Sequence, residues 1–228
     1  MNKEQCQALI DRFSEVINAD RFRLLEDVLD QRTRHLVVGL DDIYQPQNAS
    51  AIIRSCECLG IQELYAIEDR NTHKVNRAVV KGASKWIDLH LYRQARGRRN
   101  CLDDLKQQGY RIVAMSLSEN NLPLEQLPVD DKLALFIGCE ETGLDKTIEA
   151  AADYHVQIPI CGFTQSYNVS VSAGISLYYL TNRIKQALPM QDWQLANEDR
   201  QQLLLDWLSK STPTGENLLN KYKQEMGL

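Results

Sequence analysis

The sequence predicts an α/β protein with a mainly parallel sheet that is flanked by helices. Short apolar runs of strand length alternate along the chain with longer segments in which apolar residues recur at helical spacing, and this alternation is typical of parallel sheets. Most of the runs are apolar throughout, as expected for strands that are covered on both faces. The expected strands are residues 35–40, 63–67, 86–92, 111–115, 133–137 and 156–160.

Helices are expected between these strands and at both ends of the chain. Residues 5–29 have apolar positions at helical spacing with an interruption at 18–20, which indicates two short helices. The helices of the α/β region are expected at 50–59, 101–108, 144–152 and 169–185. After Pro189 the composition becomes polar, and a helix is expected from an N-cap near Asn197, followed by a last charged helix.

The chain is expected to fold as one domain with two helical extensions. Its 228 residues, of which 43% are hydrophobic, can bury one sizeable core. We assign residues 1–30 to an N-terminal helical extension, 31–188 to the domain and 189–228 to a C-terminal helical extension. Neither a run of about 18 apolar residues nor a signal-peptide pattern occurs, so we expect no membrane association and a cytoplasmic location.

The net charge of −5 excludes a protein that coats nucleic acid through a general positive field. An RNA ligand would have to bind a local basic patch, although basic residues on a solvated helix equally serve solubility. Three patches are candidates: Arg21, Arg23, Arg32 and Arg34; Arg93, Arg96, Arg98 and Arg99; and Arg183 with Lys185. The six cysteines are scattered and no metal-ligand spacing occurs, so we expect neither a metal site nor disulfides.

The segment around residues 48–54 holds two candidate catalytic residues. Asn48 precedes an expected helix, where an asparagine commonly serves only as the helix cap. Arg54 lies six residues later, in a helix expected to pack on the sheet. An arginine in that position needs an anionic partner or a pocket opening, and a phosphate is one such partner.

Two further segments place polar residues where parallel strands end. Gly138 and Glu140 follow the expected strand 133–137, and ligands of open α/β sheets gather at the carboxyl ends of strands. As an alternative, Glu140 could simply begin a helix at its favourable N-terminal end. Ser166 and Asn168 precede the long helix 169–185, whose free N–H groups can hold an anion, although either residue could be only its cap.

Taken together and in order, these segments resemble the three motifs of the TrmH/SpoU family of RNA ribose methyltransferases, in the SPOUT class. The motifs read N-x-S-A-I-x-R-x-x-x-x-x-G from Asn48, I-G-x-E-x-x-G from Ile137 and I-P-I-x-G-x-x-x-S-x-N-V-S-V-S-A from Ile158. The resemblance runs from about Arg32 to Arg183. It implies a deep trefoil knot at about residues 115–182. Pattern reasoning alone would not predict this knot, because knots are essentially absent from protein folds.

The resemblance also implies a cofactor and a set of site residues. S-adenosylmethionine would lie in the knot loops, at the positions of Met115, Gly138, Ile158 and Tyr167. The G-x-G-x-x-G loop of other methyltransferases is absent, which agrees with such a site. The family's catalytic positions correspond to Asn48, Arg54, Glu140, Ser166 and Asn168. Arg54 would either activate the ribose 2′-hydroxyl or anchor a phosphate, since a group with a pKa above about 12 is a poor base.

The implied activity is methyl transfer from S-adenosylmethionine to a ribose 2′-hydroxyl of tRNA, with guanosine 18 of the D-loop as the expected target. Family members are homodimers with an active site shared between subunits, and Arg21, Arg23, Arg32 and Arg34 would contact the RNA. One alternative is the same reaction on ribosomal RNA, but such relatives often carry an added N-terminal domain, whereas about 30 residues precede the first expected strand here. A non-catalytic RNA-binding module and a nucleotide-binding enzyme on a plain doubly wound sheet are further alternatives.

Overall fold

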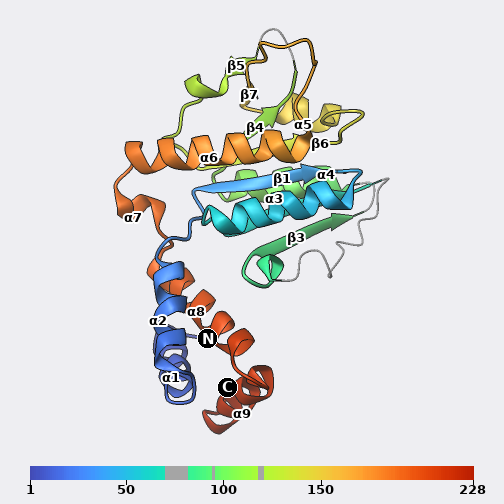
Figure 1. Ribbon diagram of the computed structural model, residues 1–228. Coiled ribbons are helices and arrows are strands. Elements are labelled where there is room, and N and C mark those ends of the chain that lie inside the picture. Colours follow the sequence, from blue (N-terminus) through green and yellow to red (C-terminus); the bar gives the residue numbers. More distant parts are fainter. Residues whose placement is uncertain (70–81, 94–95, 118–120) are drawn as a thin grey trace. The chain divides into compact units, whose positions relative to one another are not determined.

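Two compact units make up the structure. The computed structural model of the protein describes residues 1–69, 82–93, 96–117 and 121–228 (Figure 1). The larger unit is Thr33–Trp193, and the smaller unit combines Met1–Arg32 with Gln194–Leu228. Both ends of the chain therefore belong to the smaller unit, in which helices from the two ends pack on one another.

The larger unit is built on a seven-stranded sheet of parallel strand pairs, in the order β3-β2-β1-β6-β4-β7-β5. The sheet confirms the predicted α/β class with a parallel sheet. Six strands lie close to the predicted runs, whereas the two-residue β5 has no counterpart among them. The strands are β1 (Leu36–Asp41), β2 (Glu63–Glu68), β3 (Asp88–Arg93), β4 (Arg111–Met115), β5 (Leu122–Pro123), β6 (Leu133–Gly138) and β7 (Tyr154–Gln157).

The limits of two strands differ from the prediction for identifiable reasons. The sequence predicts a strand over 156–160, whereas β7 ends at Gln157, because Pro159 has no N–H to donate to a strand ladder. The sequence also predicts a strand from residue 86, whereas a 3₁₀ turn, η1 (Ala83–Lys85), occupies the preceding residues and Trp86 closes that turn. The strand β3 then begins at Asp88.

Helices cover both faces of the sheet. Along β1, Leu36, Val38 and Leu40 face the apolar core that contains α3 and α6, whereas Val37 faces a second core that contains α4 and α5. Figure 1 shows α3 and α6 running along the sheet, and the two helices contact each other. The elements around the sheet are α3 (Pro46–Cys58), α4 (Gly97–Gln107), α5 (Lys146–Ala151), α6 (Val169–Ala187), the single turn α7 (Met190–Trp193) and the 3₁₀ turn η2 (Leu124–Gln126).

The helices of the smaller unit are α1 (Lys3–Ser14), α2 (Ala19–Leu29), α8 (Asn197–Ser211) and α9 (Gly215–Glu225). The predicted interruption is present, because the Asn18 side chain accepts hydrogen bonds from the N–H groups of Asp20 and Arg21 and so starts α2. Asn197 is not the cap that the sequence suggests, since Ala196 precedes the helix at the cap position and makes no side-chain hydrogen bond there.

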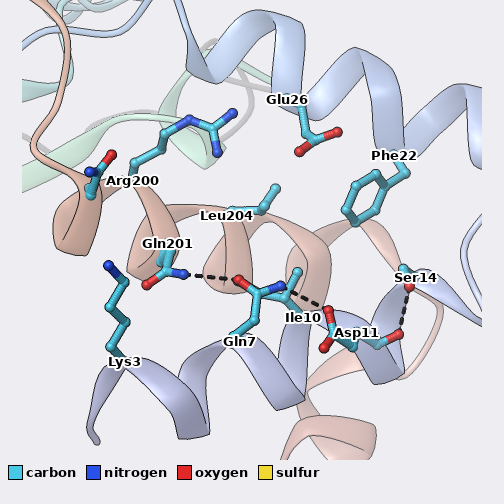
Figure 2. A pocket seen from close by; sticks show the side chains of 11 residues that line it. Lys3, Gln7, Ile10, Asp11, Ser14, Phe22, Glu26, Arg200, Gln201 and Leu204 are labelled. Carbon is cyan, nitrogen blue, oxygen red and sulfur yellow. Dashed lines mark hydrogen bonds between the residues drawn. The ribbon is translucent and has the colours of Figure 1, made fainter. Parts of the chain in front are cut away.

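Polar side chains connect the helices around a cavity in this unit (Figure 2). The cavity measures about 470 Å³ and is lined by residues of α1, α2 and α8. Gln201 Nε2 donates to Gln7 Oε1 at 2.9 Å, and Gln7 Nε2 donates to Asp11 at 2.8 Å. The first of these bonds joins α8 to α1 across the cavity wall, and the second lies within α1. Among the described residues, no helix combines the length and apolar character that crossing a bilayer requires.

The packing of β1 against β6 generates a testable prediction at Gly39. Gly39 pairs with Phe136, and a Cβ atom at Gly39 would lie 2.4 Å from two atoms of the Phe136 ring. Gly39→Ala should therefore lower the free energy of unfolding by about 1–3 kcal/mol, measured by urea denaturation. The matched control is Gly162→Ala, whose added methyl would meet only Thr164 Oγ1 at 3.9 Å. Equal stability of the two variants would contradict this account of the core.

Candidate active site

A large cavity of the α/β unit lies where parallel strands end. It measures about 830 Å³ and is lined by Met115 at the end of β4, by Gly138 and the turn after β6, and by Ile158 just beyond β7. Asn48 in the first turn of α3 and the segment before α6 complete the wall. Because carboxyl ends of parallel strands share one edge of the sheet, motifs far apart in the sequence meet there.

Eight of the nine residues expected at the catalytic and cofactor positions line this cavity. They are Asn48, Met115, Gly138, Glu140, Ile158, Ser166, Tyr167 and Asn168. The lining includes Glu140, Glu141 and Glu149, and no lysine or arginine is among the described lining residues, so the cavity wall is acidic.

Three polar side chains form a hydrogen-bonded row across the cavity wall. Asn168 Nδ2 donates to Asn48 Oδ1 at 3.3 Å, and Asn48 Nδ2 donates to Glu140 Oε1 at 2.5 Å. The other carboxylate oxygen of Glu140 accepts the backbone N–H of Tyr44 at 3.0 Å. The row connects α6, α3 and the turn after β6, and each amide has its orientation set by its neighbours.

The same contacts determine the charge of Glu140. Partial burial alone would raise the pKa of this carboxyl, but the hydrogen bonds from the Asn48 side chain and from the backbone N–H groups of Tyr44 and Gln45 outweigh it and lower the pKa below its usual value. Glu140 is therefore ionised at neutral pH and presents a negative charge at the cavity wall.

The simpler helix-cap interpretations of these residues have different outcomes. Asn48 does not cap α3, because the helix begins at Pro46 and Gln45 holds the cap position. Glu140 does not begin a helix, since α5 starts only at Lys146. Asn168 does cap α6, because its Oδ1 accepts the N–H of Ser170 at 2.9 Å. Its amide nitrogen donates to Asn48, so Asn168 both caps α6 and belongs to the hydrogen-bonded row.

Gly138 has a steric role in the turn after β6. Cys139 and Gly143 exchange backbone hydrogen bonds of 3.1 and 2.9 Å, which folds the turn back over Gly138. A Cβ atom at Gly138 would lie 2.2 Å from the carbonyl carbon of Gly143. Only glycine therefore allows the turn to close in this way, and the packing of the turn itself accounts for a glycine at this position.

Arg54 stands apart from the other expected site residues. It lies on α3 with an exposed side chain and is not among the described residues that line the cavity. The sequence separation of six positions places Asn48 and Arg54 about 9 Å apart along the helix and about 120° apart around it. The two side chains therefore leave the helix in different directions, and only Asn48 faces Glu140.

The four arginines expected to contact RNA are in very different environments. Arg32 is 1% exposed, and its guanidinium lies over the ring of Trp207 at 5.2 Å, so it does not lie on the surface. Arg34 is bound to Glu63 at 2.6 Å and to Asp88 at 3.1 Å. Arg21 is partly exposed, and Arg23 is largely exposed, with its pair to Asp20 also at the surface.

The other two basic patches are also partly engaged within the protein. Arg98 is surrounded by carboxylates, with Asp41 at 2.8 Å and Asp69 at 2.7 Å. Arg183 donates to the backbone oxygens of Leu124 and Leu127 at 3.3 and 2.9 Å. These partners are remote in the sequence, so local patterns do not reveal them.

Within the described ranges, no group of three or more His, Cys, Asp or Glu side chains is placed to hold a metal ion.

The cavity contains polar residues that the motifs did not single out. Gln45, Glu149 and Gln165 line it alongside the expected residues. Gln165 is adjacent to the motif residue Ser166, and Gln45 precedes the proline that starts α3, so both could have been found by their neighbours. Glu149 lies on α5, remote from the three motifs, and no sequence signal marks it.

Comparison with known proteins is consistent with this geometry. The model of the SpoU rRNA methylase family matches residues 35–178. The chain is 40% identical to the tRNA (guanosine(18)-2′-O)-methyltransferase of Borreliella burgdorferi over 91% of this chain and 94% of that protein. A solved structure, the TrmH/SpoU tRNA modifying enzyme of A. aeolicus, matches with a TM-score of 0.74 and 29% identity over 85% of this chain and 98% of that one.

A second solved structure shares the fold at lower identity. The SpoU methyltransferase AviRb from Streptomyces viridochromogenes, in complex with the cofactor AdoMet, matches with a TM-score of 0.58 and 22% identity. The match covers 69% of this chain and 60% of that one.

The bond between Asn48 and Glu140 predicts an energetic coupling that depends on pH. A double-mutant cycle with Asn48→Ala and Glu140→Gln should give about 0.5–1 kcal/mol of coupling in the free energy of unfolding at pH 7, at the low end because the carboxylate is partly exposed. Because the folded pKa of Glu140 is lowered, this stability is present above the unfolded pKa and is lost as pH falls through the folded pKa. Coupling that persists unchanged in acid would contradict it.

Proposed function

The chain belongs to the SpoU rRNA methylase family, and on that premise we propose that it transfers the methyl group of S-adenosylmethionine to the ribose 2′-hydroxyl of guanosine 18 in tRNA. The structural observation that carries the proposal is the row of Asn168, Asn48 and Glu140 along the wall of one acidic cavity at the strand ends. The tRNA substrate follows from the 40% identity to the Borreliella burgdorferi enzyme over most of both chains.

The cavity fits the proposed cofactor in size and in chemistry. Its volume of about 830 Å³ lies within the range of small-molecule sites. Apolar side chains of Met115, Leu144 and Ile158 offer packing surface for an adenine ring, and the ionised Glu140 suits a positively charged ligand. When bound, S-adenosylmethionine supplies an electrophilic methyl group on a cationic sulfur.

The residues of the chain would then orient the reactants and handle one proton. Glu140 has a lowered pKa and is therefore a weak proton acceptor at neutral pH, so we assign it to positioning and electrostatics. Asn48 and Asn168 keep Glu140 in place, and Ser166 and Tyr167 line the cavity from the segment before α6. Holding the 2′-hydroxyl in line with the methyl group is the main requirement of a single displacement.

Arg54 is proposed to act on the ribose or its phosphate. A guanidinium holds its proton strongly and is a poor base, so anchoring a phosphate that accepts the proton is the alternative to direct activation of the hydroxyl. Its exposed side chain lies outside the cavity lining of its own subunit. We therefore propose that Arg54 completes the active site of a partner subunit.

We also propose a homodimer, because α6 carries a stripe of exposed apolar side chains. Val171, Ile175 and Tyr178 recur at helical spacing along α6, and 48%, 40% and 65% of their surfaces are exposed. A contiguous apolar stripe next to the cavity segment is typical of a buried protein interface. Two copies of α6 would bury this stripe and bring two cavities together.

A trefoil knot is proposed for the region of residues 115–182. The strand β7 lies between β4 and β5 in the sheet, although β4 and β5 are consecutive along the chain. This order, in which a later strand lies between two strands that are consecutive along the chain, supports a threaded chain. The cavity-lining residues Met115, Gly138 and Ile158 follow the strands of this region.

We propose Arg21 and Arg23 as tRNA contacts, because their side chains reach the surface whereas Arg32 is buried. A protein that modifies tRNA in bacteria would work in the cytoplasm. Methylation of ribosomal RNA and binding of RNA without catalysis are the competing functions, and the assay below separates them.

The proposed function predicts methyl transfer to one ribose of tRNA. The full chain, incubated with labelled S-adenosylmethionine and an unmodified tRNA transcript, should label guanosine 18, and a transcript with a 2′-deoxy sugar there should accept none. Arg54→Ala should lower the rate by at least about 100-fold, and near-normal turnover by Arg54→Lys would favour the anchor role over the base role. Labelling of a ribosomal RNA fragment instead, or cofactor binding without transfer, would support the competing functions.

The proposed dimer predicts a change of mass on substitution within the stripe. Ile175→Asp should convert the protein from dimer to monomer at micromolar concentration, measured by light scattering, because a buried unpaired carboxylate opposes association. Methyl transfer should fall with it. Met190→Asp, which alters a 55% exposed apolar residue elsewhere, should leave the dimer intact. A wild-type monomer would contradict the proposal.

A further inference from the structure

Arg98 joins three segments at the end of the sheet. Its Nε donates to Asp41 Oδ1 at 2.8 Å, and its Nη1 donates to Asp69 Oδ2 at 2.7 Å. Asp145 Oδ2 lies 3.9 Å from the same Nε. The side chain of Arg98 is only 14% exposed, so these carboxylates, and not solvent, are its principal partners.

The position of Arg98 is unfavourable for the helix that carries it. It is the second residue of α4, where the helix dipole disfavours a positive charge. The local helix therefore does not account for an arginine there, whereas the three carboxylates do. Planar guanidinium groups can bind carboxylates on more than one edge, which a lysine cannot do.

Asp41 is the buried centre of this group. It is the last residue of β1, is 1% exposed, and its Oδ2 accepts the backbone N–H of Asp145 at 2.8 Å. Burial raises the pKa of Asp41, while the hydrogen bond from Asp145 and the charge of Arg98 oppose that rise. Without Arg98, the acceptor of the Asp145 N–H would be a buried and uncompensated charge.

Asp145 ends the turn that forms a wall of the candidate active site. Its Oδ1 accepts the N–H of Thr147 at 2.8 Å and so starts α5. The turn itself has a cavity on each side, because Cys139, Thr142, Gly143 and Leu144 line both the acidic cavity of about 830 Å³ and a second cavity of about 310 Å³. Asp41 and Arg98 line the second cavity.

Because this turn has a cavity on each side, its position depends on the contacts made at its two ends. At its start, Glu140 is held by Asn48 and Tyr44. At its end, Asp145 is held by Asp41, whose charge is balanced by Arg98. The two ends are therefore secured by separate sets of contacts, and one set can be removed while the other remains.

We propose that Arg98 is a positioning residue for the methyl-donor site, which holds the wall formed by residues 139–145 in its binding geometry through Asp41 and Asp145. The proposal rests on the proposed function, because it takes the ligand of the acidic cavity to be S-adenosylmethionine. Arg98 touches neither reactant in this role. A residue of an RNA-binding basic patch would instead contact the phosphates of RNA directly.

The test measures cofactor and tRNA affinity separately on the full chain. Arg98→Gln should raise the Kd for S-adenosylmethionine, measured by calorimetry, by at least about tenfold, which is the effect of losing one charge-assisted hydrogen bond. Turnover at saturating cofactor and the Kd for tRNA should stay near wild type, since Glu140 keeps its own contacts. Lys106→Gln, which removes an exposed positive charge from the same helix, should change neither affinity.

A conservative variant covers the case in which Arg98→Gln does not fold. Arg98→Lys keeps the charge beside Asp41 but cannot bind both Asp41 and Asp69 as the guanidinium does, so it should raise the cofactor Kd by a smaller factor, about threefold. A folded Arg98→Lys or Arg98→Gln with the wild-type cofactor Kd would overturn the proposal. A raised Kd for tRNA alone would overturn it too and would assign Arg98 to RNA contact. Failure of the wild type to bind S-adenosylmethionine would instead refute the proposed function.

Discussion

The hydrogen bond from Asn48 to Glu140 joins the parts of the molecule on which the candidate site depends. Its donor lies in the first turn of α3 and its acceptor in the turn after β6, two segments that follow neighbouring strands of the sheet. Asn168, the cap of α6, extends the connection to the third motif. Because each amide has one acceptor and two donors in fixed positions, the orientation of one side chain determines that of the next. The shape of the cavity wall thus follows from the parallel sheet, which brings these segments to one edge.

Most of the larger unit could be predicted from the sequence, because its signals are local. Short runs, most of them apolar throughout, predicted six strands close to their observed places, and the strands β1, β2 and β6 are buried along their whole length. The limits of elements were less predictable where a single residue interrupts a pattern, as Pro159 does after β7. The cap alternative for Asn48 fails for a similar reason, since Pro46 at the first position of α3 starts the helix earlier than the apolar pattern indicates.

The environments of arginines could not be predicted, because their partners are distant along the chain. Arg34 pairs with Glu63 and Asp88, and Arg32 lies over Trp207, whereas the sequence shows only that these two arginines are near one another and near Arg23. Arg54 differs in the other direction. It was expected to be enclosed because its helix packs on the sheet, but its side chain is exposed. An arginine count therefore says little about RNA affinity in a protein with a net charge of −5. What matters is how many of the arginines remain at the surface after internal pairing.

The two carboxylates that secure the wall of residues 139–145 are stabilised by different kinds of donor, and the difference has a chemical consequence. Asp41 is buried and paired with the guanidinium of Arg98, so its charge is largely cancelled where it lies. Glu140 receives hydrogen bonds from an amide and from backbone N–H groups, which lower its pKa without supplying a full positive charge. A cationic donor in place of the Asn48 amide would neutralise the cavity wall. Neutral donors keep the carboxylate both fixed and negative, and both properties favour the binding of a cationic ligand.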